Sequence, residues 1–335
     1  MHTNRNYYQW IDYAKFLSIF LVVFFHSPPA FDGFPAILLG LIRMPMFFFL
    51  SGLLFKREKY TSFVSFIKHR SRQLLVPYVY FFLLFYSYWL IYGKNHGNQD
   101  DLEATYYQPI VEYLYGVPDL VCMPLWFIPC LFVCQCLFYL GFKKMNRIIA
   151  AVLLFIISAI PYFIDLSNTP FSLNEVCRGI CFYGIASLYR QEIINLIERK
   201  IYVFICLLSF TVVYVLMSYM IMELRLSVWA YILKTLASLL VIYPILILMK
   251  LLSDLFGYQF FIRGIASNAI IILAFHTYSI TALDRIFIFL NFEYILGAGI
   301  YHKFMIAILS MITMIVPIWL VNKYTPLFRE KRVQV

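Results

Sequence analysis

The stretch DYAKFLSIFLVVFFHSPP, Asp12–Pro29, decides how the rest of the chain is interpreted. Ten uncharged residues separate Lys15 from His26, so an apolar segment carries ionisable groups at both ends. A helix turns by about 100° and rises about 1.5 Å per residue, which brings Lys15 and His26 onto one face, about 16 Å apart. Asp12 precedes Lys15 by three residues, so it lies on the same stripe and within reach of pairing with it.

The composition indicates a polytopic membrane protein. Of 335 residues, 63% are hydrophobic and only 13% are charged, whereas a soluble domain carries about 25% charged residues. The net charge of +10 comes from short basic clusters between apolar runs. It therefore indicates orientation in a membrane and not a nucleic-acid partner. No signal-peptide cleavage site follows the first apolar run, and we expect one domain over residues 1–335.

Ten apolar runs approach the length of a membrane span. They cover residues 9–27, 34–55, 73–92, 121–142, 148–164, 176–189, 201–222, 227–249, 265–283 and 303–322. With the N-terminus inside, nineteen basic residues fall on the inner side, and the outer side holds only Lys94, Arg225, Arg285 and Lys303. This asymmetry follows the positive-inside rule. The predicted fold is an all-α bundle of about ten transmembrane helices in the cytoplasmic (inner) membrane, with both termini cytoplasmic.

Two long segments are expected on the outer side, residues 93–120 and 284–302. The first is acidic and rich in tyrosine, and the second carries Asp284, Arg285 and Glu293. Aromatic rings stack on sugar faces and carboxylates accept hydrogen bonds from hydroxyl groups, so these segments suit a saccharide. An interfacial aromatic belt with a solvated loop explains the same composition, and the sequence leaves both interpretations open.

The largest basic cluster on the inner side is KREKYTSFVSFIKHRSRQ, residues 56–73. The loosely helical spacing of residues 60–68 predicts a short interfacial helix. The cluster serves either as a topology signal among lipid headgroups or as a binding site for the phosphates of a nucleotide-like ligand. The seven cysteines lie mostly inside apolar runs and form no CxxC motif. They are expected to be packing residues, with no metal bound.

His26 is the candidate general base, because imidazole titrates near neutral pH. It ends the first run near the outer side, so one helix face links an inner charged site to an outer base. This arrangement suits a reaction whose donor and acceptor arrive from opposite sides. A snorkelling lysine with a structural histidine fits the same spacing. Other ionisable groups in or beside apolar runs are Arg43, Glu175, Arg178, Lys234 and His276, and a proton-coupled transporter would use the same residue types.

Four segments resemble, in order, the acyltransferase-3 family of membrane acyltransferases. IDYAKFLSIFLVVFFHS (residues 11–27) resembles the first span of the family, in which ten residues separate a basic residue from a histidine. RMPMFFFLSGLLF (43–55) resembles the second span, FIKHRSRQLLVPYV (66–79) the basic motif before the third, and MPLWFIPCLF (123–132) the start of the fourth. The Asp-x-x-Lys form is similar to the fucose 4-O-acetylase-like branch.

The resemblance implies transfer of an acetyl group from acetyl-CoA to a hydroxyl of a cell-surface or exported saccharide. His26 corresponds to the essential histidine of the family. Lys15 corresponds to the basic residue that helps to hold the donor, although the family often has arginine there. Arg70 and Arg72 match the basic motif, in which Gln73 stands where a second arginine is common.

The resulting hypothesis is an integral membrane O-acetyltransferase of the cell envelope with His26 as catalytic base. Asp12, Lys15, Arg70 and Arg72 are expected to bind or orient the donor, and Arg43, Trp126 and His276 to support the cavity. The expected partners are acetyl-CoA, a saccharide acceptor and membrane lipids. One alternative is a transporter or flippase of a glycan or lipid-linked intermediate that uses His26 and His276 for proton coupling. Another is a member of the same family that moves a different acyl group, such as succinyl.

Overall fold

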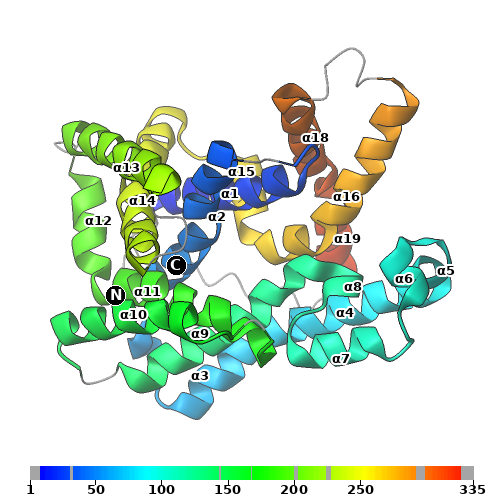
Figure 1. Ribbon diagram of the computed structural model, residues 1–335, viewed down its shortest axis with the longest axis horizontal. Helices are drawn as coiled ribbons and strands as arrows, with labels where there is room; N and C mark the ends of the chain where they lie inside the picture. The colour runs from blue at the N-terminus through cyan, green and yellow to red at the C-terminus, as the bar shows by residue number, and fades with distance from the viewer. Residues whose placement is uncertain are drawn as a thin grey trace. The chain divides into compact units, whose positions relative to one another are not determined.

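The computed structural model describes residues 8–30, 33–142, 145–166, 168–199, 203–223, 228–291 and 299–325, and within them every side chain except those of 203–207, 219 and 221–223. These ranges are helical and contain no strand (Figure 1). The predicted all-α polytopic fold is confirmed. Several residues used in the charge comparison lie outside the described residues, as does one acidic residue of the second outer segment: Arg5, Lys143, Lys144, Lys200, Arg225, Glu293, Arg329, Lys331 and Arg332.

The predicted spans coincide with helices. Within the described ranges, six stretches are long and apolar enough to cross a membrane: Gly33–Leu53, Phe63–His96, Asp119–Gly141, Val228–Phe256, Ala269–Phe289 and Ile300–Tyr324. Two shorter apolar helical stretches are Arg147–Phe163 and Leu208–Ser218. Each of the ten predicted runs overlaps a helix. The number of spans and the side of the termini stay predictions, because length and composition do not place a helix relative to a bilayer.

The chain forms two compact units. Unit 1 contains Met1–Leu50 and Gln191–Val335, and unit 2 contains Ser51–Arg190. The expectation of one domain over residues 1–335 stays a prediction.

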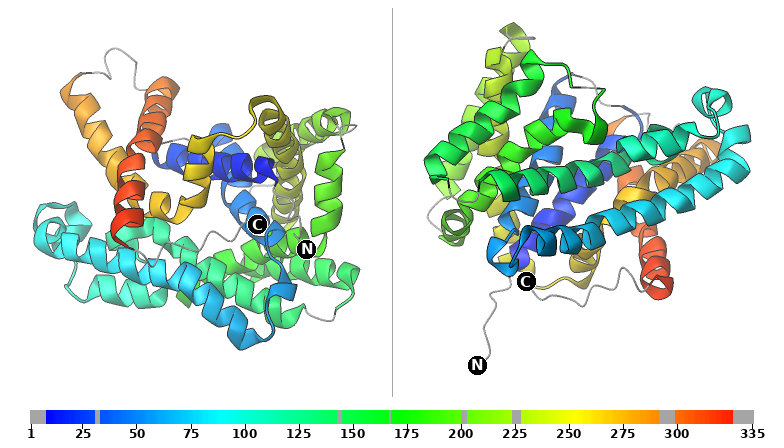
Figure 2. Two further views of the ribbon diagram at one scale, coloured as in Figure 1. Left: turned by 180° about the vertical axis from the view of Figure 1, so that it is seen from behind. Right: turned by 90° about the horizontal axis from the view of Figure 1, so that it is seen from below.

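In unit 1, α1 (Gln9–His26) packs against four helices from the C-terminal half (Figures 1 and 2). These are α14 (Val228–Phe256), α15 (Phe260–Ser267), α16 (Ala269–Phe289) and α18 (Ile300–Thr313). Trp10, Ile19 and Val23 of α1 are buried in these contacts. The indole of Trp10 donates a hydrogen bond to Glu198 at 3.1 Å, at the end of α12 (Arg190–Glu198). Burial along nearly its whole length holds α1 in place.

Two further packing contacts complete unit 1. Leu41 of α2 (Gly33–Leu53) forms a small core with α14 and with α13 (Val203–Glu223). The other buried members of this core are Val213, Met217, Ala237 and Val241. The C-terminal α19 (Ile315–Tyr324) packs against α16 and α18. Since α2 carries Arg43, this core helps to set the position of that side chain.

Unit 2 begins with the last residues of α2, followed by a short helical turn, η1 (Arg57–Lys59), and a continuous helical rod over residues 63–96. The rod consists of α3 (Phe63–Arg70), a π-helical turn η2 (Ser71–Leu75), α4 (Val76–Tyr88), a second π-helical turn η3 (Trp89–Gly93) and α5 (Lys94–His96). Pro77 stands in the first turn of α4, and because proline cannot donate a backbone hydrogen bond, the wider turn of η2 accommodates it. The short helix predicted over residues 60–68 corresponds to α3.

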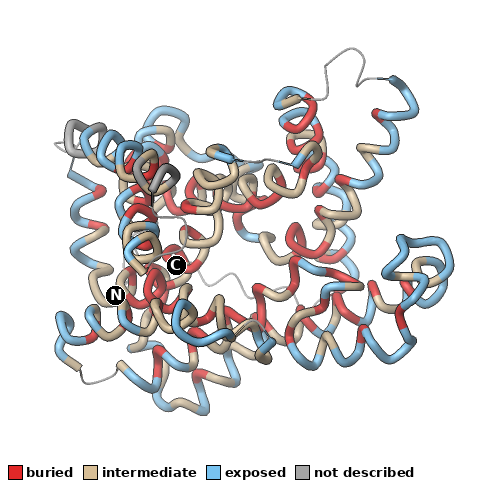
Figure 3. Tube along the Cα trace, viewed as in Figure 1, coloured by how far each residue is buried: buried red, intermediate tan, exposed pale blue. Residues whose placement is uncertain are grey.

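The remaining helices of unit 2 pack around α9 (Phe127–Gly141) and α11 (Leu173–Leu188). The others are α6 (Gln99–Glu103), α7 (Gln108–Tyr115), α8 (Asp119–Cys122), η4 (Met123–Trp126), α10 (Arg147–Phe163) and η5 (Pro170–Ser172). On α10, four isoleucine and valine side chains are more than half exposed: Ile148, Ile149, Val152 and Ile156. Figure 3 shows buried residues on the packed sides of the helices and exposed residues on the opposite sides. An exposed apolar face of this kind suits contact with lipid.

The end of α2 approaches α11 very closely within unit 2. A Cβ atom added to Gly52 would lie 2.0 Å from the backbone oxygen of Tyr183. The guanidinium of Arg190 donates to the carbonyl of Leu53 at 2.8 Å and so caps the end of α2. An aromatic cluster lies beside this contact, in which the rings of Phe66 and Tyr139 stack with centroids 4.5 Å apart.

The predicted outer segment 93–120 is folded and not an extended loop. The indole of Trp89 donates to Asp101 at 2.7 Å, and the hydroxyl of Tyr78 donates to the carbonyl of Tyr113 at 2.9 Å. The ring of Tyr113 also stacks on Phe82 with centroids 4.0 Å apart. These contacts hold α6 against η3 and α7 against α4. Of the tyrosines in this segment, Tyr106, Tyr107 and Tyr115 remain exposed.

Candidate functional site

Two histidines from distant parts of the sequence meet in unit 1. His26 is the last residue of α1, and His276 lies in the middle of α16. Their ring centroids are 5.2 Å apart and the ring planes meet at 61°. His276 is fully buried, whereas His26 is only partly covered. The more accessible ring, His26, is therefore the one that a substrate can reach.

The hydrogen bonds of His276 define its neutral tautomer. Its Nδ1 lies 2.9 Å from the carbonyl of Ile272 and 3.1 Å from that of Leu273. Because a carbonyl only accepts, Nδ1 carries the proton and Nε2 carries the lone pair. Nε2 is buried and has no hydrogen-bond partner among the described residues. A buried acceptor beside His26 can receive an N–H from the neighbouring ring or from a ligand.

Arg43 brings positive charge to the same place. It lies on α2, two residues before Pro45, and its guanidinium carbon is 3.5 Å from the centroid of the Phe25 ring. Stacking on an aromatic face is a favoured environment for arginine in a dehydrated site. Arg43 also lies within electrostatic range of His26. The structure thus brings together three of the predicted site residues: His26, Arg43 and His276.

Lys303 joins this group, although it was assigned only to the outer charges in the sequence. Its Nζ donates to three backbone carbonyls at the end of α1, those of Phe25, Ser27 and Pro29. The sequence could not predict this burial. Lys303 is the first residue of an apolar run, and at that position the sequence does not distinguish a buried lysine from an exposed one.

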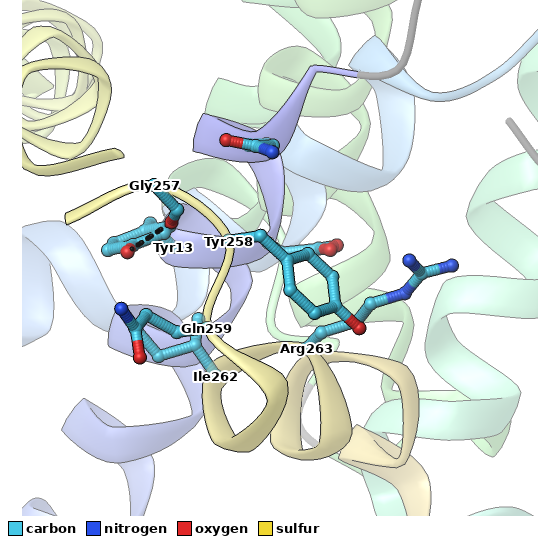
Figure 4. A pocket seen from close by; sticks show the side chains of 8 residues that line it. Tyr13, Gly257, Tyr258, Gln259, Ile262 and Arg263 are labelled. Atoms are coloured by element: carbon cyan, nitrogen blue, oxygen red, sulfur yellow. Dashed lines mark hydrogen bonds between the residues drawn. The ribbon is translucent and has the colours of Figure 1, made fainter. Parts of the chain in front are cut away.

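A small, open hollow lies beside the other end of α1 (Figure 4). Gln9, Asp12 and Tyr13 line it from α1, and five residues line it from the junction of α14 and α15: Gly257, Tyr258, Gln259, Ile262 and Arg263. The hydroxyl of Tyr13 donates to the carbonyl of Gly257 at 2.8 Å. Gly257 ends α14 with φ +64°, a left-handed conformation that favours glycine.

The hollow offers groups suited to an anionic or polar ligand. The guanidinium of Arg263 lies 5.6 Å from the ring centroid of Tyr258, and both side chains appear at one side of the hollow in Figure 4. Asp12 is at this end of α1, and Lys15 follows one turn later. The helical rise separates Lys15 from His26 by about 16 Å. Asp12 and Lys15 are therefore apart from the histidine pair, as the sequence predicts.

The remaining predicted residues belong to unit 2. Arg70 ends α3, and its guanidinium donates to the side-chain oxygen of Gln73 at 2.8 Å. Gln73, which stands where the family often has arginine, therefore acts as an acceptor that orients Arg70. Arg72 is exposed, and Trp126 is partly buried at the end of η4.

Metal ligation and disulfide bonding have no visible basis in the described part of the chain. No group of three His, Cys, Asp or Glu side chains there is placed to hold a metal ion. The six cysteines whose side chains are described are all free thiols: Cys122, Cys130, Cys134, Cys136, Cys177 and Cys181. The side chain of Cys206 lies outside the described set.

Comparison with known proteins identifies the family. A family model described as an acyltransferase domain, that of the acyltransferase-3 family, matches residues 8–323 and so extends across both units. Searches of curated proteins and of solved structures returned no match. The family match indicates acyltransferase activity. It therefore favours the enzyme over the alternative of a transporter, which performs no acyl transfer. The chain belongs to the acyltransferase-3 family and is an integral membrane acyltransferase.

Proposed function

We propose that this acyltransferase moves an acetyl group from cytoplasmic acetyl-CoA to a hydroxyl of a cell-surface or exported saccharide, in the inner membrane. The single observation that carries the proposal is the partly accessible His26 ring, 5.2 Å from His276 and within electrostatic range of Arg43. A general base and a cation beside it assist acyl transfer to a hydroxyl, because the base takes the hydroxyl proton and the cation stabilises the oxyanion.

In the proposed reaction, the hydroxyl oxygen of the acceptor attacks the carbonyl carbon of the acetyl thioester. The imidazole of His26 removes the hydroxyl proton as the new C–O bond forms. The C–S bond then breaks, and His26 returns the proton to the departing thiolate. Imidazole suits both steps, as the neutral base in the first and as the imidazolium acid in the second, because its ordinary pKa lies near neutral pH. Arg43 supplies positive charge for the oxyanion that develops on the carbonyl oxygen.

The donor is proposed to be held by Asp12, Lys15, Arg70 and Arg72. Lysine and arginine bind phosphate groups, and arginine does so in a bidentate manner. The exposed position of Arg72 and the Gln73 contact of Arg70 support this role, because both side chains are on the surface or partly on it. The long pantetheine arm of CoA is suited to span much of the distance from Lys15 to His26. Trp126 and His276 are proposed to support the cavity.

The acceptor is proposed to meet the aromatic side chains of the segment 93–120. Tyr106, Tyr107 and Tyr115 are exposed on a framework fixed by the Trp89–Asp101 and Tyr78–Tyr113 hydrogen bonds. Exposed rings on a fixed framework suit stacking on sugar faces.

Heat stabilisation of the purified protein tests the donor. Acetyl-CoA is expected to raise the unfolding temperature, because a ligand that binds only the folded state stabilises it. The rise is expected to be larger than with succinyl-CoA at the same concentration, because stabilisation increases with affinity. Mass spectrometry of surface glycans from cells with and without the protein tests the transfer. Loss of acetyl groups in the cells that lack the protein supports the proposal. Loss of succinyl groups instead would correct the donor, and unchanged glycans would contradict a saccharide acceptor.

A further inference from the structure

The ammonium group of Lys303 is buried in unit 1. The residue belongs to the first turn of α18, and none of its surface is exposed. Lysine is almost never fully buried unless its charge is compensated, because removing an ammonium group from water is strongly unfavourable. The partners of this side chain must therefore explain its position. They lie at the C-terminal end of α1, which α18 contacts directly (Figure 1), and in the residues just beyond it.

Three of its partners are backbone oxygens on either side of His26. The Nζ atom donates to the carbonyl of Phe25 at 3.1 Å, to that of Pro29 at 2.9 Å, and to that of Ser27. An ammonium group has three N–H donors, so these three bonds use all of them. Lys303 therefore has no N–H left to donate to a substrate or to an oxyanion. Its action on any reaction at His26 has to pass through the backbone.

The end of α1 is held by two sets of hydrogen bonds. The last carbonyls of a helix have no partner within the helix, and they carry the negative end of its dipole. Ser27 satisfies two of them, because its N–H lies 3.1 Å from the carbonyl of Val23 and 3.3 Å from that of Phe24. Lys303 satisfies the next one, on Phe25, and continues to Ser27 beyond the helix. The residues that it binds therefore stand on both sides of His26.

We propose that Lys303 is a positioning residue: it locks the C-terminal end of α1 so that the His26 ring keeps its place beside His276. This inference rests on the proposed role of His26 as the base. The cation compensates the negative end of the helix dipole, and the three hydrogen bonds hold the backbone of residues 25–29 in a single conformation. A displacement of about 1 Å at a reacting group costs about 100-fold in rate, so a small loosening here has a large effect on catalysis.

The test compares acetyl transfer by purified wild-type protein with that by Lys303→Met, Lys303→Gln and Lys303→Arg. Methionine keeps the length of the side chain but removes the charge and every donor. The expected result for Lys303→Met is a fall in kcat of roughly 100-fold, with the KM for acetyl-CoA changed by less than about twofold. Lys303→Arg, which keeps the charge and several donors, is expected to recover at least tenfold of that loss. A merely structural defect would not produce this split or this recovery.

Two measurements separate a failure of this inference from a failure of the proposed function. Heat stabilisation by acetyl-CoA is expected to be retained in Lys303→Met, and amide hydrogen exchange of the peptide covering residues 19–30 is expected to rise. A matched control is Lys323→Met, which removes an exposed lysine of α19 and is expected to leave kcat unchanged. If the wild type itself neither binds acetyl-CoA nor transfers acetyl, the proposed function fails and the inference fails with it.

The results that overturn the inference alone are equally specific. Wild-type kcat in Lys303→Met, or equal losses in the Met and Arg variants, would show that the lysine does not position His26. Should Lys303→Met fail to accumulate, Lys303→Gln decides, because it keeps two N–H donors without the charge. It is expected to lose roughly tenfold in kcat, and a wild-type kcat in that variant would overturn the proposal.

Discussion

Replacing Gly52 with alanine tests the close contact between α2 and α11 within unit 2. The added Cβ would lie 2.0 Å from the oxygen, 2.7 Å from the carbonyl carbon and 2.9 Å from the Cα of Tyr183. All three are backbone atoms of a helix, so no side chain can rotate out of the way. The two helices would have to separate by more than an ångström to reach ordinary van der Waals distance.

The expected cost follows from that separation. Overpacking a rigid contact costs about 1–3 kcal/mol, and a gap of 0.5–1 Å loses roughly a quarter to a half of each dispersion contact along the interface. The separation also disturbs the cap that Arg190 places on the Leu53 carbonyl. We therefore expect the free energy of unfolding to fall by about 3 kcal/mol, which corresponds to a fall of roughly 4 °C in Tm for a chain of 335 residues.

The assay is thermal unfolding of the purified protein in detergent at fixed protein and detergent concentrations. Gly40→Ala is the matched control, because Gly40 lies on the same helix and an added Cβ there meets nothing within 4 Å. That control is expected to be neutral or to stabilise by up to about 1 kcal/mol, since alanine is the better helix former. A Tm for Gly52→Ala within 1 °C of the wild type, at the precision of the assay, would refute the close contact.

Three further substitutions test other parts of the account. Arg70→Gln is expected to raise the KM for acetyl-CoA by about tenfold or more with little change in kcat, because a charged contact to a phosphate of the donor is lost. Titration with acetyl-CoA measures the KM, and an unchanged KM would contradict the assignment of Arg70 to donor binding. Arg43→Met is expected to lower kcat by about tenfold or more while stabilisation by acetyl-CoA persists, and normal kcat would exclude Arg43 from the site. Trp89→Phe is expected to cost about 1–2 kcal/mol, through the lost bond to Asp101; thermal unfolding measures this, with the exposed Trp229→Phe as control.

The helices could be predicted from the sequence because a membrane restricts the backbone conformations that an apolar segment can adopt. Backbone groups in hydrocarbon must be bonded within their own segment, so an apolar run such as 121–142 becomes a helix close to its predicted limits, here Asp119–Gly141. The third run extends further than predicted, from Phe63 to His96, because the amphipathic residues before it and the polar ones after it continue the helix. Hydropathy marks where a chain is apolar and not where a helix ends.

The packing of the outer segment 93–120 could not be predicted in this way. Its helices depend on hydrogen bonds from Trp89 to Asp101 and from Tyr78 to Tyr113. The second pair is 35 residues apart. Tyrosine-rich composition suggested a sugar or an interface, but composition carries no information on which rings are used for internal stacking.

The candidate site was predictable along one helix and not between helices. Periodicity alone places Asp12, Lys15 and His26 on one face of α1. The proximity of His26 to His276, 250 residues later, requires the tertiary fold. Lys303 shows the limit most clearly, because a count of charges assigns it to the outer surface, whereas the packed helices bury it at the end of α1.

The most direct test of the central claim is the rate of acetyl transfer from acetyl-CoA to the isolated surface saccharide by purified His26→Ala protein. If His26 is the general base, transfer falls to background, while membrane insertion, protein level and heat stabilisation by acetyl-CoA remain those of the wild type. Removal of a general base typically costs about 10²–10⁴-fold in rate. Acetyl transfer by His26→Ala at the wild-type rate would contradict the account.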